Sequence, residues 1–154
     1  MELPAEVDEP TLYSGMKIQS DFHIHTNFIS NRLLSSSGVS PENALSMDAT
    51  LTKWAESLPT YFHPNYDGPI AESSFLFTRS RLWWRFWNLK IILFRQLLLQ
   101  RAVDKGKGTV PFNTTSVDER CRSVAVHAAT ATIESIDYYT KHGVMNRLVT
   151  WYSM

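Results

Sequence analysis

Several features that mark common protein classes are scarce or missing in this sequence. Cys121 is the only cysteine among the 154 residues, which excludes an internal disulfide framework and a multi-cysteine zinc cluster. Acidic and basic side chains number 15 each, so no overall field draws the chain toward nucleic acid or acidic membranes. The N-terminus is acidic and lacks the apolar stretch of a secretory signal, so we expect a protein that stays inside the cell.

Long apolar runs and strand-like alternation are missing too. The most apolar segment, residues 82–103, contains Arg85, Lys90, Arg95 and Arg101. Each of these charges would cost about 2.5 to 3.5 kcal/mol at the depth of a bilayer, so we expect no membrane span. No alternating run exceeds a few residues and no repeat recurs at a fixed period, which favours an all-α fold.

Apolar residues recur at helical intervals over most of the chain, and this predicts a bundle of about five helices. After an acidic, extended lead-in over residues 1–13, the predicted helical domain covers residues 14–154. Its helices are predicted at 14–34, 41–58, 75–103, 116–142 and 144–154, with loops near 35–40, 59–74 and 104–115. Ser40 with Pro41, and Ser116 with Glu119, are typical helix starts, and Gly143 is a typical helix stop.

The third predicted helix is apolar on more than one face, which is typical of a helix at the centre of its domain. The residues predicted to be buried are Trp54, Leu58, Trp87, Leu93 and Ile136. Six basic residues and several interleaved aromatic residues between Glu72 and Asp104 also raise the alternative of a nucleic-acid surface. Because the aromatic residues surround the helix, the pattern favours buried rings with paired or snorkelling arginines.

A metal site is a second alternative, because Asp21, His23 and His25 resemble the first metal-binding strand of the polymerase and histidinol phosphatase superfamily of metal-dependent hydrolases. On a strand, His23 and His25 would point to the same side and bind one ion. On a helix they lie about 200° apart. The apolar period around them favours a helix, and no later histidine-rich motif supplies further ligands, since His63, His127 and His142 stand alone. We therefore predict no metal-binding residues.

No residue pattern indicates catalysis. Cys121 would need a histidine and an electropositive setting to act as a nucleophile, and only Arg120 and Arg122 lie beside it. The sequence around Gly106 and Gly108 lacks the spacing of a nucleotide-binding loop. We expect a packed helix cysteine and no enzyme, with no catalytic and no cofactor-binding residues in this chain.

Five segments in order resemble the fungal-specific regulatory domain, the middle homology region of fungal zinc-cluster transcription factors. The segments are residues 3–9 (LPAEVDE), 22–34 (FHIHTNFISNRLL), 54–62 (WAESLPTYF), 85–102 (RFWNLKIILFRQLLLQRA) and 121–136 (CRSVAVHAATATIESI). The resemblance covers nearly the whole chain. Gln96 stands where the family pattern has a proline, a change that is expected to affect local packing in the central helix.

The resemblance implies a non-catalytic nuclear regulator that modulates DNA-templated transcription, with a protein partner or a small-molecule effector. In the family, a six-cysteine cluster that holds zinc and reads DNA precedes this domain. We therefore expect zinc only in that missing N-terminal module, DNA contact only through it, and a chain that is a fragment or a shortened product. Homodimers and heterodimers both stay open, as does a truncated module that pairs with a full-length regulator.

Overall fold

The computed structural model describes residues 10–35, 38–66, 68, 73–107 and 116–142, and these ranges contain helices and no strand. The elements are α1 (Leu12–Leu33), α2 (Pro41–Glu56), the short 3-10 helix η1 (Thr60–Phe62), α3 (Ser73–Gly106) and α4 (Ser116–His142). The predicted all-α class is confirmed. The fifth predicted helix, at 144–154, and most of the predicted lead-in lie outside the described residues.

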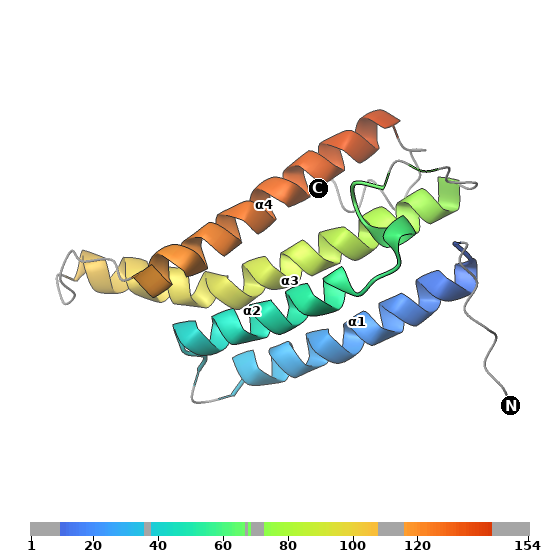
Figure 1. Cartoon of the computed structure of the whole chain (residues 1–154). Coiled ribbons are helices and arrows are strands. Elements are labelled where there is room, and N and C mark those ends of the chain that lie inside the picture. The colour runs from blue at the N-terminus through green and yellow to red at the C-terminus, as the bar shows by residue number, and fades with distance from the viewer. Residues whose placement is uncertain (1–9, 36–37, 67, 69–72, 108–115, 143–154) are drawn as a thin grey trace, which may run out of the picture.

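Consecutive α-helices run in opposite directions and pack around α3 (Figure 1). The long helix α3 contacts α1, α2 and α4, and α4 also contacts α2, so α3 is central as the sequence predicts. Among the described residues, no helix combines the length and the apolar composition that crossing a bilayer requires.

The starts of α1 and α2 follow from side chains that satisfy free backbone amides. Thr11 and Ser14 form a reciprocal capping box: the Ser14 amide donates to Thr11 Oγ1 at 3.0 Å, and the Thr11 amide donates to Ser14 Oγ at 2.9 Å. This box begins α1 two residues earlier than predicted. Ser40 accepts from the Asn43 amide at 3.2 Å, and Pro41 occupies the first helical position, so the predicted start of α2 is confirmed.

The core forms where the tryptophan-rich half of α3 meets the apolar faces of its neighbours. The buried residues of this half are Leu82, Trp83, Trp84, Phe86, Trp87, Leu89, Leu93 and Phe94. Ile18, Phe22 and Ile29 come from α1, Ala44 and Leu51 from α2, and Cys121, Ala125 and Ala128 from α4. Because the apolar side chains of α3 lie on several faces, one neighbouring helix could not cover them all.

The segment after α2, predicted as a surface loop over 59–74, is exposed at Pro59, Thr60, Pro64 and Asn65, but two of its rings are buried in the core. Tyr61 and Phe62 in η1 are 8% and 0% exposed. Their rings pack against Phe75 at centroid distances of 5.9 and 5.0 Å, and the Phe62 carbonyl accepts a hydrogen bond from Trp83 Nε1 at 2.6 Å. Aromatic packing and a satisfied carbonyl thus hold this proline-flanked segment against α3.

Further differences concern boundaries and two of the residues predicted to be buried. Helix α3 begins at Ser73 and ends at Gly106, which shortens both predicted loops beside it, and α2 ends at Glu56, before the predicted 58. Leu58, Trp87 and Leu93 are buried as predicted, but Trp54 and Ile136 are half-buried. The Trp54 ring packs against Phe22 of α1 at 5.4 Å and Phe86 of α3 at 6.4 Å, with part of its surface in solvent. Ile136 belongs to the second half of α4, and this half of the helix diverges from α2 in Figure 1.

Cationic side chains of α3 form polar contacts with each of the other α-helices. Arg85 donates to Gln19 Oε1 of α1 at 3.0 Å, Lys90 pairs with Asp48 of α2 at 3.0 Å, and Arg101 pairs with Asp118 of α4. Each contact joins a cationic side chain of α3 to a polar or acidic group on its neighbour. These contacts therefore help to fix how far each helix is shifted along α3.

Gly15 marks a close approach between α1 and α3 and gives a first prediction. A Cβ at this position would lie 2.9 Å from Thr78 Cγ2, closer than carbon atoms normally pack. At an open helical position, replacing Gly by Ala stabilises by about 0.5–1 kcal/mol, and we expect Gly15→Ala to lose this gain. Urea unfolding measures the difference.

The matched control is Gly106→Ala, since a Cβ at Gly106 meets no atom within 4 Å. Adding Thr78→Ser, which removes Cγ2 and keeps the hydroxyl, should restore the gain in the Gly15→Ala background. An equal stabilisation by Gly15→Ala and Gly106→Ala in the wild-type background would contradict the close approach.

Leu93 gives a second prediction, because its side chain is fully buried on α3 whereas Leu99 on the same helix is 59% exposed. We expect Leu93→Ala to lower the free energy of unfolding by about 2–5 kcal/mol, since the substitution leaves a cavity. The same change at Leu99 should cost less than about 1 kcal/mol. Thermal and urea unfolding of both variants measures the two losses in stability. Similar losses for Leu93→Ala and Leu99→Ala would refute the placement of the core.

Candidate binding groove

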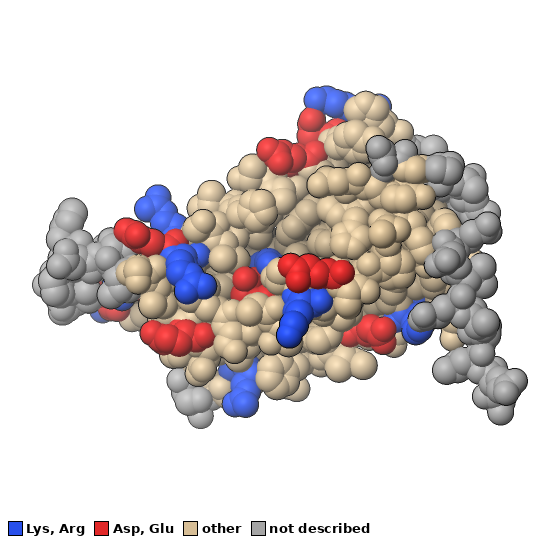
Figure 2. Space-filling view, viewed as in Figure 1, with Lys and Arg blue, Asp and Glu red and all other residues tan. Residues whose placement is uncertain are grey.

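A groove lies on the face of the molecule where α2 and α4 diverge over α3. Near the starts of the two helices they touch, with Cys121 Sγ donating to the Pro41 carbonyl over 3.9 Å. From there the helices separate toward the end that η1 occupies (Figure 1). The space between them is a cavity of about 1130 Å³ that Figure 2 shows as a hollow in this face. It is therefore bounded by three helices and by the segment that follows η1.

Aromatic rings of α3 form the floor of the groove. Trp83, Phe86 and Trp87 line it, because residues three and four apart lie on one side of a helix. The Trp83 ring lies 5.1 Å from Phe86 and 5.6 Å from Trp87, measured between centroids. The hydrogen bond from Trp83 Nε1 to the Phe62 carbonyl fixes the orientation of the first ring. The floor is thus a rigid and largely apolar surface.

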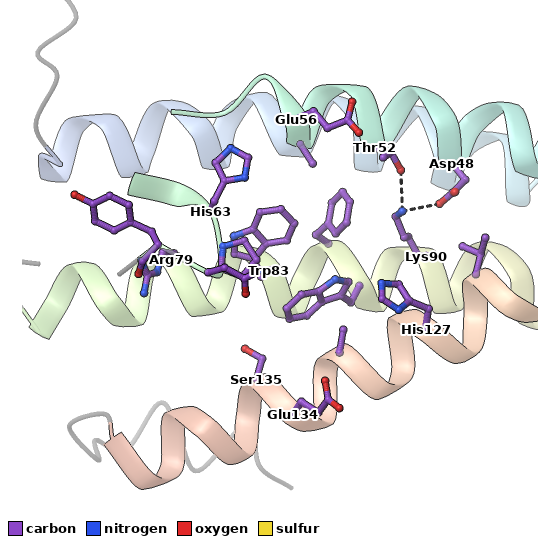
Figure 3. A pocket seen from close by; sticks show the side chains of 18 of the residues that line it. Asp48, Thr52, Glu56, His63, Arg79, Trp83, Lys90, His127, Glu134 and Ser135 are labelled. Carbon is purple, nitrogen blue, oxygen red and sulfur yellow. Dashed lines mark hydrogen bonds and ion pairs between the residues drawn. The ribbon is translucent and has the colours of Figure 1, made fainter. Parts of the chain in front are cut away.

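The cations of the groove are held by protein groups. Lys90 Nζ lies 3.0 Å from Asp48 Oδ1 and donates to Thr52 Oγ1 at 2.8 Å (Figure 3), and it also lies 4.8 Å from the centroid of the Phe86 ring. At the other end Arg79, which is 6% exposed, donates to the Tyr66 carbonyl at 3.3 Å. Burial lowers the pKa of Arg79 from its ordinary value. An arginine nevertheless stays charged at neutral pH.

The rim of the groove carries exposed titratable side chains. Glu56 of α2 and Glu134 with His127 of α4 face the opening from opposite sides (Figure 3). His63 lies beyond the end of η1, and its Nε2 donates to the Leu58 carbonyl at 3.0 Å. Neither glutamate forms an ion pair within the described residues. The opening is therefore acidic on both sides.

The residues of the metal-site alternative lie on α1, far from a strand geometry. Asp21 and His23 are exposed, and the half-buried His25 packs its ring 5.6 Å from that of Trp54. Because α1 is helical, His23 and His25 project about 200° apart. In the part of the chain that the structure describes, no three His, Cys, Asp or Glu side chains come close enough to hold one ion. The arrangement that the hydrolase alternative requires does not form here.

The rings of the tryptophan-rich stretch lie inside the fold. Trp83, Trp84, Phe86 and Trp87 are all buried, as the favoured interpretation predicts, and so present no stacking platform. Several of the interleaved basic side chains are engaged in the contacts with α1, α2 and α4 described above. Figure 2 shows both signs of charge intermixed on the groove face, with no continuous basic patch.

Cys121 is a packed helix cysteine in the described structure. It is 2% exposed, and burial raises the pKa of its thiol, with Asp118 and Glu42 adding smaller contributions in the same direction. A raised pKa leaves less thiolate at neutral pH, and the thiolate is the reactive form. His127 lies at the groove, and no hydrogen bond joins it to the thiol in the described residues.

Alkylation by iodoacetamide tests this description of Cys121. At pH 8 we expect the native chain to react at least about tenfold more slowly than the chain unfolded in urea, because the thiol is both enclosed and protonated. The native rate should rise with pH as the thiolate forms. The control is Cys121→Ser/Ser123→Cys, which moves the thiol to an exposed position on the same helix and should react rapidly. Equal native rates for the two chains would contradict the burial.

Sequence reasoning did not find the groove. Its floor residues were predicted to be enclosed, and its polar residues Asp48, Lys90 and Glu134 carried no motif. The one usable signal was the repeat of aromatic residues at positions 83, 86 and 87, which places them on one side of α3. The angle between α2 and α4, which opens the groove, depends on contacts between distant segments.

Comparisons with protein-family models, with curated proteins and with solved structures give no match to this chain. A function for the chain has to follow from its own residues and their arrangement.

Proposed function

We propose that this chain is a non-catalytic regulatory region of a fungal zinc-cluster transcription factor, which modulates DNA-templated transcription in the nucleus. The resemblance of five ordered segments to the regulatory domain of that family motivates the proposal. The residues that carry the resemblance are largely structural: Leu58, Phe62 and Cys121 belong to the core, and Trp54 packs against it.

The observation that carries the proposal is the groove between α2 and α4. Both helices rest on α3, they touch near Pro41 and Cys121, and from there they diverge (Figure 1). A partner or effector that fills the groove would favour one angle over another. A preference of about 1–3 kcal/mol shifts such an equilibrium by a factor of about 5–150, which is sufficient for a regulatory signal.

The chemistry of the groove favours recognition over catalysis. In the groove, Lys90 is paired with Asp48, and Arg79 is buried. Covalent catalysis would need a nucleophile, a base and an orienting group within hydrogen-bonding distance of one another. Zinc and direct DNA contact belong, in this proposal, to a separate cysteine-cluster module. The partner proposed for this chain is a protein segment or a small-molecule effector, and either a homodimer or a heterodimer is compatible with it.

A reporter assay tests the proposed function. The chain is inserted between a heterologous DNA-binding module and an activation segment, and we expect it to change reporter output by about fivefold or more. Ala131→Phe, which places a ring inside the groove, should reduce this effect because the ring competes with the occupant. Thr130→Phe adds the same ring at the neighbouring exposed position outside the groove and should leave the effect unchanged. An inert insertion, or equal effects of the two substitutions, would count against the proposal.

A further inference from the structure

Arg79 is the one charged residue that is buried among those the structure describes. It is 6% exposed, and it forms no ion pair within the described residues. Its guanidinium donates to the Tyr66 carbonyl at 3.3 Å and lies 6.0 Å from the centroid of the Tyr66 ring. Buried charges in proteins are normally paired, because removing an unpaired charge from water is costly. An unpaired guanidinium in the wall of a cavity therefore indicates a place for an anion.

The guanidinium of Arg79 keeps hydrogen-bond donors for a ligand. An arginine carries five N–H groups in a planar fork, and this shape matches the two oxygens of a carboxylate. The Tyr66 carbonyl accepts from one nitrogen, Nη1, and because this carbonyl is uncharged it leaves the positive charge unbalanced. Arg79 lines the groove, so a ligand in the groove has access to it.

Two tyrosines of the groove lie near this guanidinium. Tyr66 precedes α3, Tyr138 belongs to α4, and both line the groove. Burial lowers the pKa of Arg79, and the phenols of Tyr138 and Tyr66 partly offset the lowering, so both lie within electrostatic range of the guanidinium. A phenolic hydroxyl can donate a hydrogen bond to an anion. An anion held by Arg79 would thus have hydroxyl donors nearby.

Beyond Arg79 the floor of the groove is apolar. Trp83, Phe86 and Trp87 follow on the same side of α3, at intervals of three and four residues. From Arg79 to Trp87 the helix rises by about 12 Å. The indole N–H of Trp83 and the amine of Lys90, at the far end, are both bound by protein groups. The groove therefore combines one unpaired charge with an apolar surface, which suits a ligand with one charged end.

The acidic rims of the opening raise the alternative of a cationic ligand. Glu56 and Glu134 are exposed, so water and salt screen their attraction for a cation. Arg79 is buried, and the attraction between a buried charge and a ligand is screened far less. The stronger interaction is thus the one with an anion. The two glutamates also disfavour a ligand with several negative charges, such as a nucleotide or a phosphorylated peptide.

We propose that the groove binds a small monocarboxylic acid with an apolar body, the carboxylate pairing with Arg79 and the apolar body lying on Trp83, Phe86 and Trp87. A cavity of about 1130 Å³ has room for an elongated molecule of this kind. The inference deepens the proposed function and rests on it in one respect, because it names the chemical class of the effector. Binding itself is measured on the purified chain. A chain that binds the acid but leaves the reporter unchanged would refute the regulatory role alone, and the opposite result would refute this inference alone.

Three ligands with the same apolar body test the charge preference on the wild-type chain. Decanoate is an anion, decanol is neutral and decyltrimethylammonium is a cation, and extended decanoate is about as long as the floor from Arg79 to Trp87. Isothermal titration calorimetry, at concentrations where all three ligands are monomeric, measures the affinities. We expect decanoate to bind at least about tenfold more tightly than either of the others, because only its charge is opposite to that of Arg79. Binding of decanol or of the cation as tight as that of decanoate, or no binding of decanoate, would overturn the proposal.

The substitution Arg79→Gln removes the charge and keeps an N–H group for the Tyr66 carbonyl. We expect it to weaken decanoate binding about tenfold or more and to leave decanol binding unchanged, since the alcohol makes no ion pair. The matched control is Arg85→Gln on the same helix, because Arg85 contacts Gln19 of α1 and does not line the groove. This control should leave the affinity for decanoate unchanged. Equal losses for decanoate and decanol in Arg79→Gln would indicate a purely structural effect and would overturn the proposal, as would equal responses of decanoate to Arg79→Gln and Arg85→Gln.

A second pair of variants keeps the test decisive if Arg79→Gln does not fold, which circular dichroism and urea unfolding show. Ala131→Phe places a ring inside the groove and should weaken decanoate binding about tenfold or more, because the ring occupies volume that the apolar body needs. Thr130→Phe adds the same ring at an exposed position outside the groove and should leave the affinity unchanged. Equal affinities of these two variants for decanoate would overturn the proposal.

Discussion

The tryptophan-rich half of α3 is apolar on nearly all sides, and the arrangement of the other elements depends on covering it. If any face of such a helix stayed in water, large aromatic side chains would be exposed. Each of these side chains buries about 150–250 Å² when it is packed. Three α-helices and η1 each take one sector around it. The antiparallel order of the α-helices follows from short connections between elements that must all reach the same central helix.

Polar contacts at the edges of this core set the register of the helices. Lys90 illustrates how, since its amine reaches Asp48 and Thr52 of α2 and lies 4.8 Å from the centroid of the Phe86 ring. The two side chains of this ion pair are only 13% exposed, so the cost of removing them from water offsets much of their attraction, but the contact fails if α2 shifts along α3 by one turn. Apolar burial therefore holds the helices together, and a few charged or amide groups choose among the alternative packings.

The sequence predicted those parts of the fold that depend on interactions between residues close together in the chain. The start of α2 at Pro41 follows from the Ser40 cap, and the burial of Leu93 and Trp87 follows from the dense apolar pattern of α3. The burial of Phe62 was not predictable in this way. The prolines on both sides give the segment the composition of a surface loop, and the residues that hold Phe62 in the core, Phe75 and Trp83, are distant in the sequence. The groove has the same origin, since it results from the angle between α2 and α4. The role in transcription stays a proposal that rests on the resemblance and on the groove.

The hydrogen bond between Trp83 and the Phe62 carbonyl limits how α2 can move. Sliding α2 along α3 would draw η1 with it and leave an indole N–H and a carbonyl unpaired in the core, at a cost of about 1–3 kcal/mol for each group. Tilting of α2 about η1 keeps both partners together. The Trp83–Phe62 hydrogen bond therefore fixes η1 on α3 at the wide end of the groove, while the contact between Pro41 and Cys121 joins α2 to α4 at the narrow end.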